Sequence, residues 1–141
     1  MLKMVLDTNV VISALLKTQS TPALIVSLAL QGRIIFCLSE NIFNEYEGVL
    51  AREKFKALNS RQVKRLLAEL KNKALFVVPE KKLEIIKEDP EDNMFLECAL
   101  EAEADFLITG NKKHFPFKTF KGISVVSPGE FINVVAEFLF E

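Results

Sequence analysis

The sequence contains few of the residues that build compact metal and redox centres. Its 141 residues include two cysteines and one histidine, and Cys37 and Cys98 do not form a CxxC pair. We therefore do not expect a zinc site made of cysteine and histidine. Both cysteines have apolar neighbours in the sequence, and we expect them to be buried thiols in a reducing cytoplasm.

Long hydrophobic runs and excess positive charge are also lacking. No apolar run reaches the roughly 20 residues that cross a bilayer, and residues 1–9 are too short for a signal peptide. We therefore expect a cytoplasmic chain with no membrane partner. The formal net charge is -1, so no strong overall field attracts polyanions, and a nucleic acid would have to bind at a local basic patch.

What the sequence does contain fits a single folded domain. Half of its residues are apolar and 26% are charged, and the length is typical of one domain with a proper core. No internal repeat, linker or low-complexity tract divides the chain. We expect one domain over residues 1–141.

Short apolar runs rich in β-forming residues alternate with segments of helical periodicity. Strands are expected at residues 3–6, 34–38, 74–78, 105–109 and 123–126, and helices at 8–17, 23–31, 39–50, 60–73, 89–104 and from 127 onward. Such alternation predicts an α/β fold, with helices on both faces of a central, mostly parallel sheet.

Asp7 stands at the carboxyl end of the first expected strand. Ligands of open α/β sheets collect at this end of the strands. A carboxylate there, with no basic residue beside it, is a natural ligand for a divalent cation. The alternative is that Asp7 only caps the following helix, because Asp is a favoured N-cap residue.

Three further polar residues map to the same edge of the sheet. Asn111 follows the fourth strand, while Glu45 and Asp92 lie in or near the first turns of helices. On a helical wheel Asp92 points inward with Leu96, where an unpaired charge is costly. The alternative is that Asp92 interacts only with the helix dipole and cap.

Other acids near these positions are harder to assign. Glu45 and Glu47 flank opposite sides of an apolar stripe, and periodicity does not choose between them. Asp89 is better explained as an N-cap with Pro90 behind it. Asp105 begins the fourth strand and therefore lies at the wrong end of the sheet to join the cluster.

Carboxylates that converge without cysteine or clustered histidine favour a hard cation such as Mg²⁺ or Mn²⁺. Centres of this kind commonly serve phosphate chemistry, because the ion polarises a phosphoryl oxygen and activates water.

Four stretches resemble the motifs of the PIN domain, in its toxin branch related to VapC-like ribonucleases. They are Leu6–Ser13, Asn44–Tyr46 ahead of Val49 and Leu50, Asp89–Asn93, and Ala104–Asn111. The resemblance covers essentially the whole chain in order. It implies a three-layer α/β/α domain whose acids bind Mg²⁺ or Mn²⁺ and cut single-stranded RNA. Asp7, Glu45 and Asp92 match the family's acidic positions.

The fourth acidic position departs from the family pattern. The family often has Asp directly after the Thr-Gly pair or a few residues later, where this sequence has Asn111 and His114. We expect Asn111 to complete the metal site, with less negative charge than usual. Lys112, Lys113 and His114, together with Lys17 at the end of the first helix, are candidates for contacts with RNA phosphates.

These observations favour a metal-dependent endoribonuclease, the toxin of a toxin–antitoxin pair, with RNA as substrate and a cognate antitoxin as partner. A second hypothesis is a PIN-like module that binds RNA or the antitoxin with weak or no catalysis. A signalling receiver domain is disfavoured because it needs an acid pair after the first strand, and here that strand ends in a single acid.

Two helices carry more apolar residues than one domain can bury, which predicts a homodimer. Residues 23–30 are apolar nearly all round, and the last helix contains Phe131, Ile132, Val134, Val135, Phe138, Leu139 and Phe140. On the wheel of that last helix, Phe140 points away from the others. The family resemblance also suggests a dimer.

Overall fold

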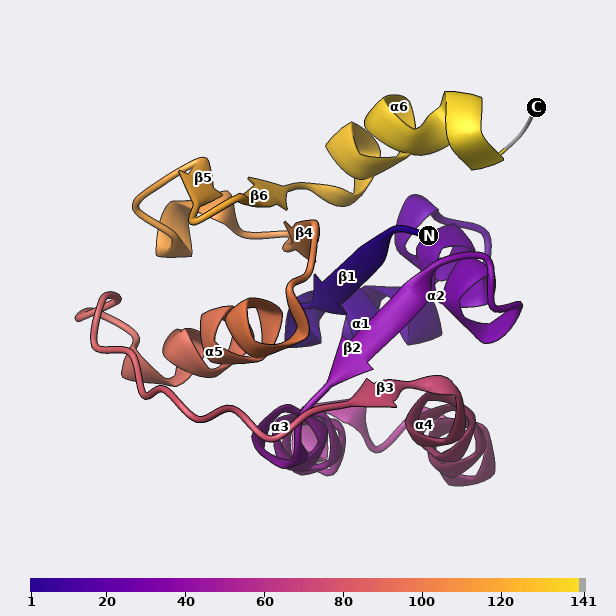
Figure 1. Cartoon of the computed structure of the whole chain (residues 1–141). Helices are drawn as coiled ribbons and strands as arrows, with labels where there is room; N and C mark the ends of the chain where they lie inside the picture. Colours follow the sequence, from indigo (N-terminus) through magenta and orange to yellow (C-terminus); the bar gives the residue numbers. More distant parts are fainter. Residues whose placement is uncertain (140–141) are drawn as a thin grey trace.

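The computed structural model describes residues 1–139 of the chain, as an α/β domain built on one six-stranded sheet (Figure 1). The strands are β1 (Lys3–Leu6), β2 (Ile35–Leu38), β3 (Leu75–Phe76), β4 (Phe106–Ile108), β5 (Thr119–Phe120) and β6 (Ile123–Val126). Their order across the sheet is β3-β2-β1-β4-β6-β5. All pairs are parallel except β5 with β6, which confirms the expected mostly parallel sheet.

The helices begin and end close to where the sequence predicts them. They are α1 (Thr8–Leu16), α2 (Thr21–Leu30), α3 (Glu40–Leu50), α4 (Ser60–Lys73), α5 (Asn93–Ala102) and α6 (Pro128–Leu139), with 3₁₀ turns η1 (Glu53–Phe55), η2 (Pro90–Asp92) and η3 (Lys112–His114). Side-chain caps fix several starts: Ser20 Oγ accepts from the Ala23 amide, and Ser39 Oγ from the Ile42 amide. Such caps satisfy amides that have no partner within the helix.

Helices cover both faces of the sheet, which confirms the three-layer arrangement. The chain moves from β1 to β2 to β3 in one direction across the sheet and then returns to β4 beyond β1. Because crossovers between parallel strands are right-handed, this reversal places α5 on the face opposite α1 and α2. Helix α5 packs on β1, β2 and β4, whereas α2 contacts α1, α4 and α6 (Figure 1).

The core is formed by the two faces of the short central strands and the apolar sides of the helices. Its largest fully buried side chains include Tyr46, Phe36, Phe95 and Phe131. Cys37 and Cys98 are both buried and free, as expected. Burial raises the pKa of the Cys98 thiol to about 12, so this thiol stays protonated at neutral pH.

Three local features differ from the sequence-based expectation. Strand β5 was not predicted, since it is only two residues long and depends on a tight turn at Lys121 and Gly122, both with positive φ (47° and 85°); such a turn matches the twist of a hairpin. Strand β3 is shorter than residues 74–78 and lies exposed at the sheet edge. The helix expected from residue 89 begins as the 3₁₀ turn η2.

Within the part of the chain that the structure describes, no single helix is long and apolar enough to cross a membrane. Taken together, α1 and α2 meet that requirement by length and composition alone, as a pair bent by 104°.

Tyr46 fastens α3 to the end of β1. Its side chain is fully buried, and its hydroxyl donates a 2.5 Å hydrogen bond to the Leu6 carbonyl oxygen. Burial is the main cause that raises the pKa of Tyr46 well above its ordinary value, so the hydroxyl remains a donor. The contact holds α3 beside the residue that follows Leu6, which is Asp7.

We expect Tyr46→Phe to lower the free energy of unfolding by about 1–2 kcal/mol, because the change leaves a buried carbonyl oxygen without its partner. Urea denaturation of both proteins measures this difference. Equal unfolding midpoints would show that the Leu6 carbonyl finds another donor.

Candidate metal centre

Strands β1 and β4 are neighbours whose chains leave the sheet in opposite directions. The connection after β1 leads to β2 on one side, and the connection after β4 leads to β6 on the other. Doubly wound sheets usually bind ligands outside the carboxyl ends of two such strands, and we call this region of the molecule the crevice. Asp7 follows β1, and residues 109–111 follow β4, so both segments border the crevice.

The Asp7 carboxylate is buried and held from two sides. The residue is 5% exposed, and its Oδ2 accepts hydrogen bonds from Thr109 Oγ1 at 2.7 Å and from Asn9 Nδ2 at 3.3 Å. The backbone of Asp7 occupies the N-cap position of α1, but its side chain makes no capping hydrogen bond. Burial raises the pKa of Asp7, and the Thr109 hydroxyl opposes that rise.

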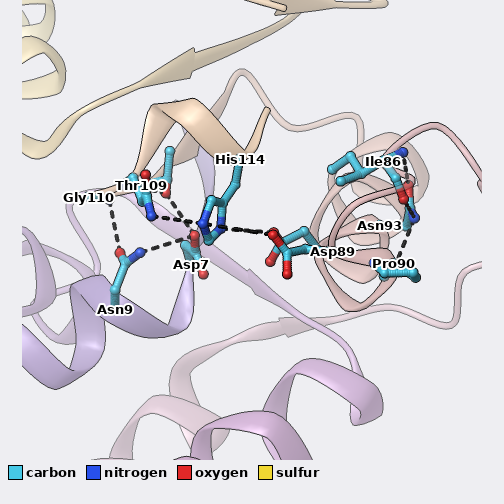
Figure 2. A network of polar contacts seen from close by, with 11 residues as sticks. Asp7, Asn9, Ile86, Asp89, Pro90, Asn93, Thr109, Gly110 and His114 are labelled. Carbon is cyan, nitrogen blue, oxygen red and sulfur yellow. Dashed lines mark hydrogen bonds and ion pairs between the residues drawn. The ribbon is translucent and has the colours of Figure 1, made fainter. Parts of the chain in front are cut away.

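A second ring of contacts fixes the residues that hold Asp7 (Figure 2). Asn9 Oδ1 accepts from the Gly110 amide at 2.9 Å, and Thr109 Oγ1 accepts from the Asn111 amide at 3.0 Å. A Cβ atom at position 110 would lie 3.2 Å from Asn9 Oδ1. A side chain at position 110 would therefore crowd Asn9, which would have to move by a few tenths of an ångström.

Asp92 brings a second carboxylate to the crevice, from the start of α5. Its side chain is 14% exposed, and its Oδ2 atom is buried without a hydrogen-bond partner. His114 Nδ1 lies 3.1 Å from this oxygen, close enough for an ion pair when the imidazole is protonated. Burial is the first cause that raises the pKa of Asp92 to about 6; the charge of Asp7 adds to the rise, and His114 opposes it.

His114 lies between the two sides of the crevice. Figure 2 shows its ring between Asp7 and Asp89. The Nε2 atom lies 2.9 Å from Asn111 Nδ2 and 3.8 Å from Asp89 Oδ2. Ligand atoms of Asp89, Asp92 and His114 all lie within 4.8 Å of one another, a spacing that allows them to share a metal ion.

Asp89 therefore has a different role from the expected one. Its backbone does occupy the N-cap position of η2, but its carboxylate makes no capping hydrogen bond and faces His114 instead. The spacing of three residues between Asp89 and Asp92 could have indicated this, because residues three apart on one turn share a face.

Asn93 fixes the segment that carries both of these acids. Its Oδ1 accepts from the amides of Ile85 and Ile86 at 3.2 and 3.0 Å, and its Nδ2 donates to the carbonyl oxygens of Ile86 and Pro90, both at 2.9 Å (Figure 2). The side chain is buried, and both of its N–H donors and both lone pairs of its oxygen are used. It ties the extended segment before η2 to the start of α5.

The structure separates the two glutamates that the sequence left undecided. Glu45 is half-buried, and its pKa is raised by burial first, and then by the nearby carboxylates of Glu91 and Asp7, against a lowering by Arg52. Glu47 is exposed and lines a groove between α3 and α4 instead. Glu45 is thus the glutamate of the pair that lies within electrostatic range of Asp7.

The three lysines suggested for contacts with RNA phosphates differ in their surroundings. Lys112 Nζ binds both carboxylate oxygens of Glu130, at 2.8 and 3.1 Å. Lys113 is exposed next to the crevice, on η3. Lys17 follows the last residue of α1, a nine-residue helix that begins at the crevice, so it lies about 13 Å away along the axis. Their roles in RNA binding stay predictions.

The fold and the crevice define an α/β domain with an acidic centre at the switch point of its sheet. A family model described as the PIN domain matches residues 3–113. The chain belongs to the PIN domain family.

Two known proteins are similar to the chain over most of its length. An uncharacterized protein of Methanocaldococcus jannaschii, MJ1680, is 26% identical over 149 aligned residues, which cover 98% of this chain and 94% of that protein. The crystal structure of VapBC2 from Rickettsia felis, bound to a DNA fragment from its promoter, contains a chain that superposes with a TM-score of 0.58. It is 17% identical and covers 89% of this chain and 98% of that one, a similarity of fold.

The proximity of Asp7 and Asp92 makes the free energy of unfolding of the metal-free protein depend on pH. Because the pKa of Asp92 is raised from 3.8 to about 6, folding favours its protonated form. This contribution to stability is fully present below pH 3.8 and is lost as pH rises through 6. Groups that face Asp92 include Asp7, Asp89 and His114.

We therefore expect Asp92→Asn, in EDTA, to melt a few degrees above the wild type at pH 7.5, because the variant removes a charge that burial and Asp7 disfavour. The difference should shrink at pH 5, where the wild-type acid is largely protonated. Thermal melts at both pH values measure it. A difference that is the same at pH 5 and 7.5 would show that ionisation of Asp92 does not strain the fold.

Proposed function

We propose that the chain is a metal-dependent endoribonuclease that hydrolyses phosphodiester bonds in single-stranded RNA, and that it acts as the toxin of a toxin–antitoxin pair. The observation that carries the proposal is the Asp92 carboxylate, whose Oδ2 atom is buried and whose pKa is raised by burial first and then by the negative charge of Asp7. Two carboxylates in one buried crevice repel each other, and a divalent cation between them would compensate both charges.

The donor set fits a hard divalent ion. Asp7 and Asp92 would bind Mg²⁺ or Mn²⁺ directly, and Glu45 and Asn111 stay our predicted further ligands. When bound, such an ion polarises a phosphoryl oxygen and lowers the pKa of a coordinated water. Family membership supports the reaction class, since PIN domains are typically nucleases.

The chain's own residues prepare this centre before a substrate arrives. Thr109 and Asn9 donate to Oδ2 of Asp7, so they orient the carboxylate. Asn93 keeps η2 against α5, and this fixes where Asp92 enters. Exposed Lys113 lies on η3 beside the crevice, where it would neutralise a backbone phosphate.

We expect Asp7→Asn to lower the rate of RNA cleavage by roughly 100-fold or more, because loss of a metal ligand removes several kcal/mol of transition-state stabilisation. The measurement is cleavage of a labelled single-stranded RNA by pure protein with Mn²⁺ or Mg²⁺. A melting curve checks that the variant stays folded.

Asp105→Asn is the matched control. Its carboxylate accepts from the Lys3 amide at the opposite end of the same pair of strands, and an Asn side chain can still accept there. The control should cleave RNA at the wild-type rate. Cleavage by Asp7→Asn at the control rate would exclude the proposed centre.

A second candidate function is an RNA-binding or antitoxin-binding module with weak or no catalysis. The supporting observation is that the fourth position carries an amide engaged with an imidazole: Asn111 Nδ2 lies 2.9 Å from His114 Nε2. Wild-type protein that binds RNA but leaves it intact at saturating Mn²⁺ would favour this second function over the first.

The partners and location follow from the same proposal. The similar structure is a complex of VapB and VapC from Rickettsia felis, and we propose that this chain also binds a cognate antitoxin, in the cytoplasm. We propose a homodimer as well. Val134 and Phe138, one turn apart on α6, are 55% and 77% exposed, and a second copy would cover them. Phe140, which also entered the sequence argument, lies outside the described residues.

We expect the double variant Val134→Glu, Phe138→Glu to be monomeric at micromolar concentration, because two buried charges at an interface cost more than the apolar contact gains. Light scattering gives the mass of each protein. Val78→Glu is the control, since Val78 is 82% exposed after β3 at the other side of the sheet. A wild type that is already monomeric would refute the dimer.

A further inference from the structure

We propose that His114 is a direct ligand of the metal ion, so that this centre selects first-row transition ions over Mg²⁺. The inference rests on the proposed function, because it concerns the same metal centre. It adds a nitrogen ligand and a metal preference that the carboxylates alone do not give.

The first step is the position of the imidazole. His114 Nδ1 lies 3.1 Å from the buried Oδ2 of Asp92. Two ligands at about 2.1 Å from one ion and at right angles to each other lie about 3.0 Å apart. The observed separation is thus close to that of neighbouring ligands on one octahedral ion, with no rearrangement of either side chain.

The second step is the orientation of the ring. Histidines that bind metals usually engage their other ring nitrogen in a hydrogen bond, which fixes the ring plane and the tautomer. Here Asn111 Nδ2 lies 2.9 Å from Nε2. An amide carries an acceptor oxygen as well as its nitrogen donors, so rotation of the Asn111 amide by 180° would place Oδ1 where it accepts from an Nε2–H group and would leave Nδ1 without a proton beside Asp92. Asn111 would then act through His114, as a positioning residue in place of the direct metal ligand proposed above.

The third step is the set of oxygen donors around the ring. Asp89 Oδ2 lies 3.8 Å from Nε2, and Asp89, Asp92 and His114 offer ligand atoms within 4.8 Å. Carboxylates alone suit Mg²⁺, which prefers oxygen and dehydrates reluctantly. Imidazole nitrogen instead suits ions such as Fe²⁺, Co²⁺ and Zn²⁺. A ligand set with the His114 nitrogen in place of a fourth acid would therefore shift the metal preference of the centre away from Mg²⁺.

The alternative roles of His114 make different predictions. If the ring only pairs with Asp92 as a cation, it competes with the metal, and its removal would strengthen metal binding. If it only contacts RNA phosphate, its removal would leave metal binding unchanged. A direct ligand predicts weaker binding of transition ions, with little change for Mg²⁺.

The decisive experiment is pulsed electron paramagnetic resonance of the full chain with bound Mn²⁺, prepared without a polyhistidine tag. His114 is the only histidine of the chain, so a coupling that changes on labelling with ¹⁵N-histidine can come from no other residue. Mn²⁺ binds nitrogen least strongly in its series, which makes it a stringent probe. We expect the histidine nitrogen coupling in the wild type and in Lys113→Ala, an exposed neighbour on η3, and its loss in His114→Ala.

Calorimetry with Co²⁺ and Mg²⁺ gives the affinities. We expect His114→Ala to weaken Co²⁺ binding by about tenfold or more, the range for loss of an interaction with a metal ligand, and Mg²⁺ binding by less than about threefold. Bound Mn²⁺ without a histidine coupling would overturn this inference and leave the proposed function intact. Tighter Co²⁺ binding by His114→Ala would also overturn it. A wild type that binds neither Mn²⁺ nor Co²⁺ nor Mg²⁺ would overturn both.

Discussion

Two largely buried carboxylates, Asp7 and Asp92, interact at the point where the connections of the sheet diverge, and the surrounding structure depends on holding them there. Repulsion between Asp7 and Asp92 grows as water is removed, because the effective dielectric falls. Each acid has its own compensation: Thr109 donates to Asp7, and His114 lies beside Asp92. The contacts of Asn9, Gly110 and Asn93 serve to keep these groups in place.

Most of the fold could be predicted because its elements are specified locally. Apolar runs between turns gave the four longer strands of the sheet, and caps such as Ser39 gave the starts of helices. The layer arrangement followed from the alternation and the handedness of crossovers. Strand β5 could not be predicted, since two residues carry no periodicity and its pairing depends on positive φ at Lys121 and Gly122. The predicted length of β3 was also too great, because the length of an edge strand depends on its pairing with a neighbouring strand, which the local sequence does not specify.

The candidate site could be predicted as an edge of the sheet but not as a set of contacts. The position directly after a strand predicted Asp7 and Asn111 as site residues, and the position on the inward face of a helix predicted Asp92. Pattern alone could not choose Glu45 over Glu47, since that depends on how α3 packs against β1 through Tyr46. The sequence predicted Asp89 as a cap from its backbone position, which is correct. The direction of its side chain is independent of that position, and the carboxylate faces His114. Thr109 was expected only as part of a strand, although its hydroxyl joins Asp7 to Asn111.

In the proposed metal centre, the exchange of an acid for an imidazole would act on both the metal-free and the metal-bound state. Without metal, a fourth carboxylate would add repulsion at Asp92, whose pKa burial first and then Asp7 raise to about 6, whereas His114 opposes that rise. In the metal-bound state the same exchange removes a negative charge, which weakens attraction for every divalent ion alike. A nitrogen donor restores part of that loss, but only for ions with affinity for nitrogen. In the proposed centre, stability without metal and selectivity among metals would therefore both depend on His114, and relief of repulsion in the metal-free protein would be accompanied by weaker binding of Mg²⁺.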